Sequence, residues 1–223
     1  VEKARLLIPL IPSHLEVHQS ALVIGGGIAG MTAASALAQQ GFTTHLVEKE
    51  NRLGGILNHL DTIAPSGIRA DDMLAAKVHE VEMSHVQLHL NTTVESIGGL
   101  VGNFSAHLSS GEDLQVGAVV VGTGSRPYEP VEFAYGKDPR VITNLELESL
   151  MAAGDLKARR ITFISCVGSR QGSIGCVRYC CTSMINQALE LRRLGKQVRV
   201  LGKDIRTYSR SAEELYEQAM RAG

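Results

Sequence analysis

Apolar and polar positions first define a strand, a helix and a second strand near the start of the chain. Ala21–Ile24 is a short apolar run, a glycine-rich turn and an alanine-rich stretch follow, and Thr43–Val47 is the next apolar run. This pattern predicts a helix over 28–40, with Gly41 as its left-handed stop. A crossover of this kind implies that the two strands are parallel.

The same order returns in the second half of the chain. The pattern there predicts a helix over 144–153, a strand over 160–165, a helix over 182–194 and a strand over 197–201. Gly195 ends the third of these elements much as Gly41 ends the first helix. The two units therefore look like a loose internal duplication. Glycines follow the first strand of one unit, and cysteines follow that of the other.

Between the two units the pattern changes to short alternating runs. Helical spacing over 71–83 precedes strand-like runs at 86–90, 92–97, 104–108 and 116–121, with a turn expected at Gly98-Gly99. These runs predict a small antiparallel excursion that returns to the main sheet. Prolines near residues 127–139 suggest a linker, and 211–222 should form a last helix. The expected organisation is a lead-in at 1–19, one domain at 20–137 and a second at 138–223.

The turn after the first strand carries the spacing G-x-G-x-x-G at Gly25, Gly27 and Gly30. Glycines at this spacing allow a tight turn, close backbone approach to a pyrophosphate and close helix packing. The helix start at Ile28-Ala29 then supplies free N–H groups to phosphates. Glu48 ends the next strand, where a carboxylate can accept hydrogen bonds from a ribose. We expect a dinucleotide site, with a merely structural glycine turn as the alternative.

The predicted fold class is therefore α/β. A Rossmann-like unit with a parallel sheet and a small antiparallel excursion is followed by a second, partial Rossmann-like unit. Composition narrows the partners: the formal net charge is -1, Trp is absent and aromatic residues make up 4%. The chain has neither the excess positive charge nor the aromatic rings for base stacking that would favour nucleic-acid binding. No apolar run approaches the ~20 residues of a membrane span, so a cytoplasmic location is expected. The start at Val1 suggests a piece of a longer protein.

All four cysteines lie close together, at Cys166, Cys176, Cys180 and Cys181, with the spacing C-x9-C-x3-C-C. Such a local group favours metal or redox chemistry over a disulfide framework. Four thiolates are the number that a [4Fe–4S] cluster needs. Spacing alone leaves open a zinc site, a redox disulfide or four buried reduced thiols. Structural zinc sites usually have two short C-x2-4-C pairs, whereas the three cysteines at 176–181 form one short group and Cys166 stands apart.

The glycine loop does not distinguish NAD from FAD, but later motifs do so by resemblance. Glu48-Lys49 with Gly54-Gly55, and a strand ending in Gly122-Thr123-Gly124, resemble the thioredoxin reductase class of flavoproteins. That resemblance implies FAD. The residues it implies for the cofactor are Gly25, Gly27, Ile28, Ala29, Gly30, Glu48, Lys49, Gly54, Gly55, Val94, Thr123 and Gly124.

Cys166-Val167-Gly168-Ser169-Arg170 and the group ending in Cys180-Cys181 resemble the flavin-binding A subunit of heterodisulfide reductase. The segments 2–7, 21–30 and 101–104 resemble it too. This resemblance implies that the four cysteines ligate a [4Fe–4S] cluster near the flavin. The loop between the first two cysteines is slightly shorter than is usual in that family. Since Cys166 enters the second turn and no G-x-G-x-x-G follows, we expect no NAD(P)H there.

By resemblance, the chain is expected to be an oxidoreductase subunit that relays or splits electron pairs from FAD through iron–sulfur centres to partner subunits. No residue stands out as a general acid or base, so no catalytic residue is named. The alternative is an NAD(P)H-dependent disulfide oxidoreductase that cycles a cysteine pair. A non-enzymatic nucleotide-binding module is a further alternative, and self-association as a homodimer is left open.

Overall fold

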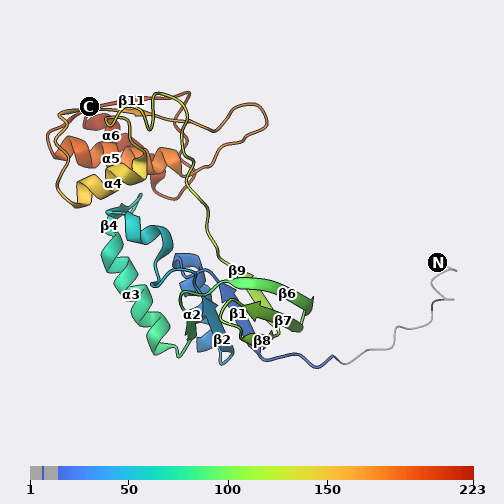
Figure 1. Cartoon of the computed structure of the whole chain (residues 1–223). Helices are drawn as coiled ribbons and strands as arrows, with labels where there is room; N and C mark the ends of the chain where they lie inside the picture. The colour runs from blue at the N-terminus through green and yellow to red at the C-terminus, as the bar shows by residue number, and fades with distance from the viewer. Residues whose placement is uncertain (1–6, 8–14) are drawn as a thin grey trace. The chain divides into compact units, whose positions relative to one another are not determined.

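A computed structural model describes Leu7 and residues 15–223 (Figure 1). Residues 2–6 of the opening motif, and most of the predicted lead-in, lie outside this description. The chain divides into two compact units. The first combines the described part of Val1–Leu53 with Glu80–Thr123, and the second combines Gly54–His79 with Gly124–Gly223. The two functional domains expected from the sequence, 20–137 and 138–223, stay a prediction.

The first unit is built on a four-stranded sheet with the order β5-β2-β1-β9, in which every pairing is parallel. Its strands are β1 (Ser20–Ile24), β2 (Thr43–Val47), β5 (Gln87–His89) and β9 (Ala118–Val121), and α2 (Ile28–Gln39) joins the first two. The predicted strand–helix–strand order is confirmed. Crossovers bring the carboxyl ends of β1 and β9 to one edge, where Ile24 is paired with Val121.

A three-stranded antiparallel sheet packs on one face of this parallel sheet. It consists of β6 (Val94–Leu100), β7 (Asn103–Leu108) and β8 (Asp113–Val116). The shared core holds Leu22 and Val47 of the parallel sheet against Ala106, Leu108, Leu114 and Val116 of the antiparallel one. The expected antiparallel excursion is thus confirmed, and it buries one side of the parallel sheet.

Two details of this excursion differ from the sequence prediction. β6 runs through Gly98-Gly99 to Leu100, so the predicted turn at these glycines is wrong. Gly99 instead adopts φ +88 beside the backbone of Asn103, a conformation that glycine allows inside a strand. The single strand predicted over 116–121 is two strands, β8 and β9, separated by Gly117. This glycine donates its N–H to Ser20 O, which redirects the chain into the parallel sheet.

The second unit contains the repeated strand–helix–strand order. Parallel strands β10 (Arg160–Ile164) and β11 (Gln197–Leu201) are joined by α5 (Cys180–Arg193) and flanked by α4 (Asn144–Ala152) and α6 (Ala212–Arg221). Figure 1 shows the three helices beside β11. Cores form between Phe163, Leu147 and Leu191, and between α5 and Leu215. α5 begins two residues earlier than predicted, which places two cysteines in its first turn.

Residues 54–79 join the second unit through buried polar contacts that the hydrophobic pattern does not predict. They contain η1 (Gly55–His59), β3 (Thr62–Ile63), β4 (Ile68–Arg69) and the start of α3 (Ala70–Met83). The buried carboxylate of Glu148 accepts from the Asp61 N–H at 2.9 Å and from Gln187 Nε2 at 2.6 Å. Asn186 Nδ2 donates to Thr62 Oγ1 at 2.9 Å. These bonds fix the segment against α4 and α5.

None of the helices in the described part of the chain has the length and hydropathy needed to span a bilayer.

Candidate functional site

The turn after β1 brings backbone against backbone at two glycines. A Cβ on Gly30 would lie 1.8 Å from Gly25 O, and one on Gly25 would lie 2.5 Å from Gly122 O. Gly25 also has φ +103 and donates its N–H to Val47 O at 2.8 Å. Since any side chain here would displace the main chain, the turn itself requires glycine. The ends of β1, β2 and β9 therefore meet at this loop.

The N-terminus of α2 is left without a side-chain cap. Gly27 is its N-cap, and along α2, all of which is described, no side chain bonds the cap position and no acidic residue occupies the first turn. A Cβ on Gly27 would meet nothing within 4 Å. Unpaired N–H groups at a helix start carry partial positive charge and bind phosphate. The open space beside Gly27, at Ile28-Ala29, fits the pyrophosphate of a dinucleotide.

Glu48 lies beside this loop with its carboxylate buried. Its Oε2 accepts the Gly26 N–H at 2.6 Å and its Oε1 accepts the Glu50 N–H at 2.9 Å. Its main chain is fixed by bonds to His89 O and from the Thr92 N–H. An ionised carboxylate has about four acceptor positions, so two stay available for ribose hydroxyls. The residues of the first unit therefore fit the adenosine side of a dinucleotide.

The other residues predicted to contact the cofactor are distributed over both units. Lys49 is exposed and pairs with Glu50 at 3.5 Å, and Val94 packs against the core. Thr123 follows β9 in the first unit. Gly54, Gly55 and Gly124 belong to the second unit, where all three have positive φ. The residues predicted to contact the phosphates and the ribose therefore lie in one unit, and all of the cofactor contacts stay predictions.

The turn after β10 carries the cysteines in place of the glycines. Cys166 follows the strand closely and adopts φ +62, an uncommon conformation for a residue with a side chain. Cys180 and Cys181 are the first two residues of α5, whose N-cap, Tyr179, provides no side-chain hydrogen bond. All four thiols are free. As in α2, a helix N-terminus without a cap follows the loop.

The thiol of Cys180 is affected by the other three cysteines. Burial, followed by the neighbouring thiols of Cys181, Cys166 and Cys176, raises the pKa of Cys180 to about 11. A bound cationic centre would favour the thiolate form of Cys180 and oppose this effect. The donor set therefore suits an iron–sulfur cluster. The described residues nonetheless contain no group of three or more side chains already placed to hold a metal ion.

Cys166 has a cation beside it. Arg170 Nη1 lies 3.8 Å from Cys166 Sγ, and its guanidinium is held by both carboxylate oxygens of Asp204, one at 3.1 Å. Burial raises the pKa of Cys166, but the hydrogen bonds from Ser165 and Arg170 outweigh it and lower the pKa overall. The sequence gives no sign that Asp204 holds Arg170 in this position, because Asp204 lies in the loop after β11, 34 residues further along the chain.

A histidine pair in the first unit was also missed by sequence reasoning. His45 Nδ1 lies 3.1 Å from His89 Nε2, and His89 Nδ1 lies 3.4 Å from Glu112 Oε2. The rings meet because β2 and β5 are neighbouring strands in the sheet. Burial, followed by the charge on His89, lowers the pKa of His45, although Glu112 acts against them. These side chains form no metal-binding group within the described chain.

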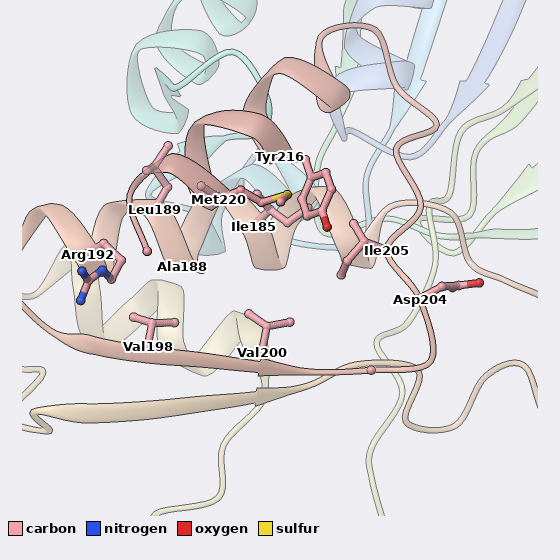
Figure 2. Close-up of a pocket in the computed structure, with 13 residues that line it drawn as sticks. Ile185, Ala188, Leu189, Arg192, Val198, Val200, Asp204, Ile205, Tyr216 and Met220 are labelled. Atoms are coloured by element: carbon pink, nitrogen blue, oxygen red, sulfur yellow. The ribbon is translucent and has the colours of Figure 1, made fainter.

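A pocket of about 360 Å³ lies in the second unit between β11, α5 and α6 (Figure 2). Val198 and Val200 point toward Ile185 and Leu189, and Tyr216 of α6 lies above them. Arg192, at one end, donates to Ala222 O. No cysteine is among the lining residues, so the pocket is separate from the thiols.

The strand–turn–helix order, which occurs twice, and the glycine loop define a protein of the dinucleotide-binding α/β class. Residues 19–164 match the family model described as "Pyridine nucleotide-disulphide oxidoreductase". This match covers more than half of the chain, so the chain belongs to that family.

Curated relatives match nearly the whole chain. It is 27% identical to the A subunit of the "H(2):CoB-CoM heterodisulfide,ferredoxin reductase" of Methanothermobacter marburgensis, over 98% of this chain and 48% of the relative. It is 26% identical to the first of two iron-sulfur A subunits of the "CoB--CoM heterodisulfide reductase" of Methanopyrus kandleri, over 99% of this chain and 49% of the relative. The resemblance predicted from the cysteine and glycine motifs is confirmed. The chain spans about half the length of these relatives.

Solved structures support the same fold. The thioredoxin reductase of Lactococcus lactis has a TM-score of 0.58 at 20% identity, and the match covers 88% of this chain and 60% of that one. The thioredoxin reductase of T. acidophilum has a TM-score of 0.58 at 13% identity, with 90% and 62% covered. The fold class predicted from the sequence is confirmed. The aligned region of the first relative is 319 positions long although this chain has 223 residues, so the relative carries insertions that this chain lacks.

Proposed function

We propose that the chain is the part of a heterodisulfide reductase A-type protein that binds the phosphates and ribose of FAD with its first unit and a [4Fe–4S] cluster with its second. Electron pairs on the flavin would leave as single electrons through the cluster to partner subunits. The observation that carries this proposal is the repeated strand–turn–helix unit. One copy leaves room for phosphates at an uncapped helix, and the other places thiols at the equivalent point.

FAD supplies the ability to accept electrons in pairs and release them singly. The chain's contribution is binding: Gly25, Gly27 and Gly30 admit the pyrophosphate, the N–H groups of Ile28-Ala29 bind it, and Glu48 accepts the ribose hydroxyls. The remaining contacts assigned to the cofactor come from Lys49, Gly54, Gly55, Val94, Thr123 and Gly124. Family membership and the resemblance to flavoproteins of the thioredoxin reductase fold support this assignment.

The cluster is assigned to Cys166, Cys176, Cys180 and Cys181. Support comes from the four free thiols, from the effect of the other three on Cys180 and from the relative that is named an iron-sulfur subunit. Ligation would oppose that effect, because each thiol would bind as a thiolate to a cationic centre. Cys166 occupies the turn that would otherwise admit a second dinucleotide, so we assign no NAD(P)H site to the second unit.

Iron analysis of the full-length protein, purified without oxygen, tests the cluster. Each single Cys→Ser variant at the four positions should lose about four irons per chain relative to wild type, together with broad absorption near 400 nm. Flavin content should be unchanged. Ser169→Ala lies in the same loop outside the ligand set and should keep its iron. Full iron content in all four Cys→Ser variants would contradict the assignment.

A second function is favoured by one observation, free thiols close in sequence on a fold shared with thioredoxin reductases. The candidate pairs are Cys180 with Cys181 and Cys176 with Cys180. A dithiol that cycles with a disulfide would make the protein an NAD(P)H-dependent disulfide oxidoreductase. In that case iron-free protein would be bleached by NADPH and would show two titratable thiols fewer when oxidised. Protein whose flavin is not reduced by NADPH and whose iron depends on the cysteines excludes this function.

A further inference from the structure

The cysteine loop is surrounded by exposed apolar and aromatic side chains. Ile174, Val177 and Tyr179 lie on the loop itself and are 56%, 48% and 63% exposed. Tyr208, from the segment after β11, is 51% exposed. Isolated exposed apolar residues are common, but Tyr and Ile gathered around one candidate redox centre mark a contact surface.

The same surface carries a connected basic network. Lys203 Nζ donates to Arg170 O at 2.8 Å, and Arg170 pairs with Asp204. Arg206 Nε lies 3.4 Å from the same Asp204, and its guanidinium donates to Tyr208 OH at 2.9 Å. These contacts make one continuous surface from the β11 end to the aromatic ring.

Arg178 extends the network onto the cysteine loop, because its guanidinium lies over the Tyr208 ring, 5.6 Å from the centroid. The network thus contains four cations, of which Arg170 and Arg206 pair with Asp204, while Arg178 and Lys203 have no carboxylate among these contacts. A second carboxylate, Glu213, accepts from Thr207 Oγ1 beside Arg206. Positive charge is in excess here although the chain as a whole has a formal net charge of -1. We call this surface, defined by Ile174, Arg178, Tyr179, Lys203, Arg206 and Tyr208, the Cys-loop face.

We propose that the Cys-loop face is the docking surface for an acidic electron-carrier protein. The inference rests on the proposed function, since the surface matters for electron transfer only if Cys166 and its partners hold a redox centre. Electron-carrier complexes use small interfaces with complementary charge, which raises the association rate and allows rapid release. The excess of cations selects an acidic partner, and the exposed Tyr179 and Ile174 supply the apolar centre of the contact.

Binding and electron transfer to a defined probe test this proposal in the full-length protein purified without oxygen. The probe is an acidic two-iron ferredoxin, with basic cytochrome c as the opposite-charge comparison. Affinity is measured calorimetrically with both proteins oxidised, and electron transfer is followed by stopped-flow absorption after the ferredoxin is reduced. Wild type should bind the ferredoxin about tenfold more weakly when salt rises from roughly 0.05 to 0.5 M, and should not bind cytochrome c.

Arg178→Glu and Lys203→Glu should each reduce the ferredoxin association rate by about tenfold at low salt, with little difference at high salt. Tyr179→Ala should weaken binding at every salt concentration. Arg159→Glu and Arg160→Glu, at the opposite end of β10, are the matched controls and should bind as wild type does. Equal effects in the controls, or cytochrome c bound as well as ferredoxin, would overturn the proposal.

The oxidised binding measurement requires no cluster, so the two proposals fail separately. Iron-free protein that still binds ferredoxin through Arg178 refutes the cluster assignment and leaves the surface standing. Iron-loaded protein that shows no salt-dependent ferredoxin binding refutes the docking surface alone.

Discussion

The turn after β1 and the turn after β10 occupy the same place in two strand–helix–strand units, yet they are built in opposite ways. After β1 the backbone of Gly25 contacts that of Gly122, and Gly30 leaves no room for a side chain. After β10 a cysteine adopts the left-handed conformation and its sulfur lies near Arg170. The shared topology delivers a helix N-terminus to the loop in both units. The loop residues decide whether backbone or sulfur is presented there.

Helix capping also differs between the helices that follow the two loops and helix α4. α2 and α5, which follow the two loops, have no side-chain cap among their described residues. α4 has a complete capping box, in which Thr143 Oγ1 accepts from the Glu146 N–H and Glu146 Oε2 accepts from the Thr143 N–H. α4 satisfies its own first N–H groups, and α2 and α5 keep theirs available. α6 also lacks a side-chain cap at Ser211, so a missing cap marks a candidate site only where a loop of glycines or cysteines precedes the helix. Three substitutions test how far this contrast extends.

Gly30→Ala should have the largest effect. Its Cβ would lie 1.8 Å from Gly25 O, and because both are backbone positions neither can move independently. We expect the first unit to lose about 3 kcal/mol of stability and the protein to lose its flavin. Denaturant unfolding and flavin absorbance measure both. Gly98→Ala, whose Cβ would meet nothing within 4 Å, is the control and should keep the flavin. Flavin retained at wild-type level in Gly30→Ala would break the contrast between the two turns.

Gly168→Ala should have a smaller effect in the cysteine loop. Its Cβ would lie 2.3 Å from the Tyr128 ring, but that ring is half exposed and can swing away. The remaining cost is the left-handed conformation at φ +66, about 1–2 kcal/mol for a residue other than glycine. Unfolding of the second unit should shift by that amount, whereas the flavin should be retained. When Tyr128→Ala is added to Gly168→Ala, the protein should recover only the part of the lost stability that comes from contact with the Tyr128 ring.

Gly175→Ala is the matched control for this loop, since its Cβ would meet nothing within 4 Å. A loss of flavin in Gly168→Ala, or an equal destabilisation in Gly175→Ala, would contradict the expectation that the two turns act separately.

Thr143→Ala should have the smallest effect, about 1 kcal/mol for a lost N-cap. The backbone hydrogen bond from Thr143 lowers the pKa of Glu146, with burial acting against it. A carboxyl whose folded pKa is lowered stabilises the fold above its unfolded pKa, and this stabilisation is lost as pH falls through the folded pKa. The difference between wild type and Glu146→Gln should therefore shrink in acid.

Urea unfolding at neutral and acidic pH measures this effect, with Ser149→Ala in the same helix as the control. Flavin and iron should be unchanged in Thr143→Ala, since α4 bears neither loop. A loss of either cofactor would show that the capped helix contributes to a site after all.

The strands and helices of both strand–helix–strand units could be predicted because each is a local pattern. The run from Thr43 to Val47 and the one from Gln197 to Leu201 match β2 and β11 in both bounds. The sequence predictions were wrong at glycines whose position within or between strands differs from what the pattern indicates. Gly98-Gly99 resembles a turn but lies inside β6, and Gly117 splits a run that resembles one strand. Propensity alone does not tell a glycine inside a strand from one in a turn.

Local sequence was enough to locate the loops of the two candidate sites: the glycine spacing after β1, the acidic end of β2 and the cysteines after β10. These are short-range features whose spacing carries their chemistry. The distant groups that meet them depend on the fold. Arg170 lies beside Cys166 because Asp204, from the loop after β11, holds it there. His45 meets His89 across 44 residues because β2 and β5 are neighbours in the sheet. Such contacts follow from strand order, which local hydrophobic patterns do not specify.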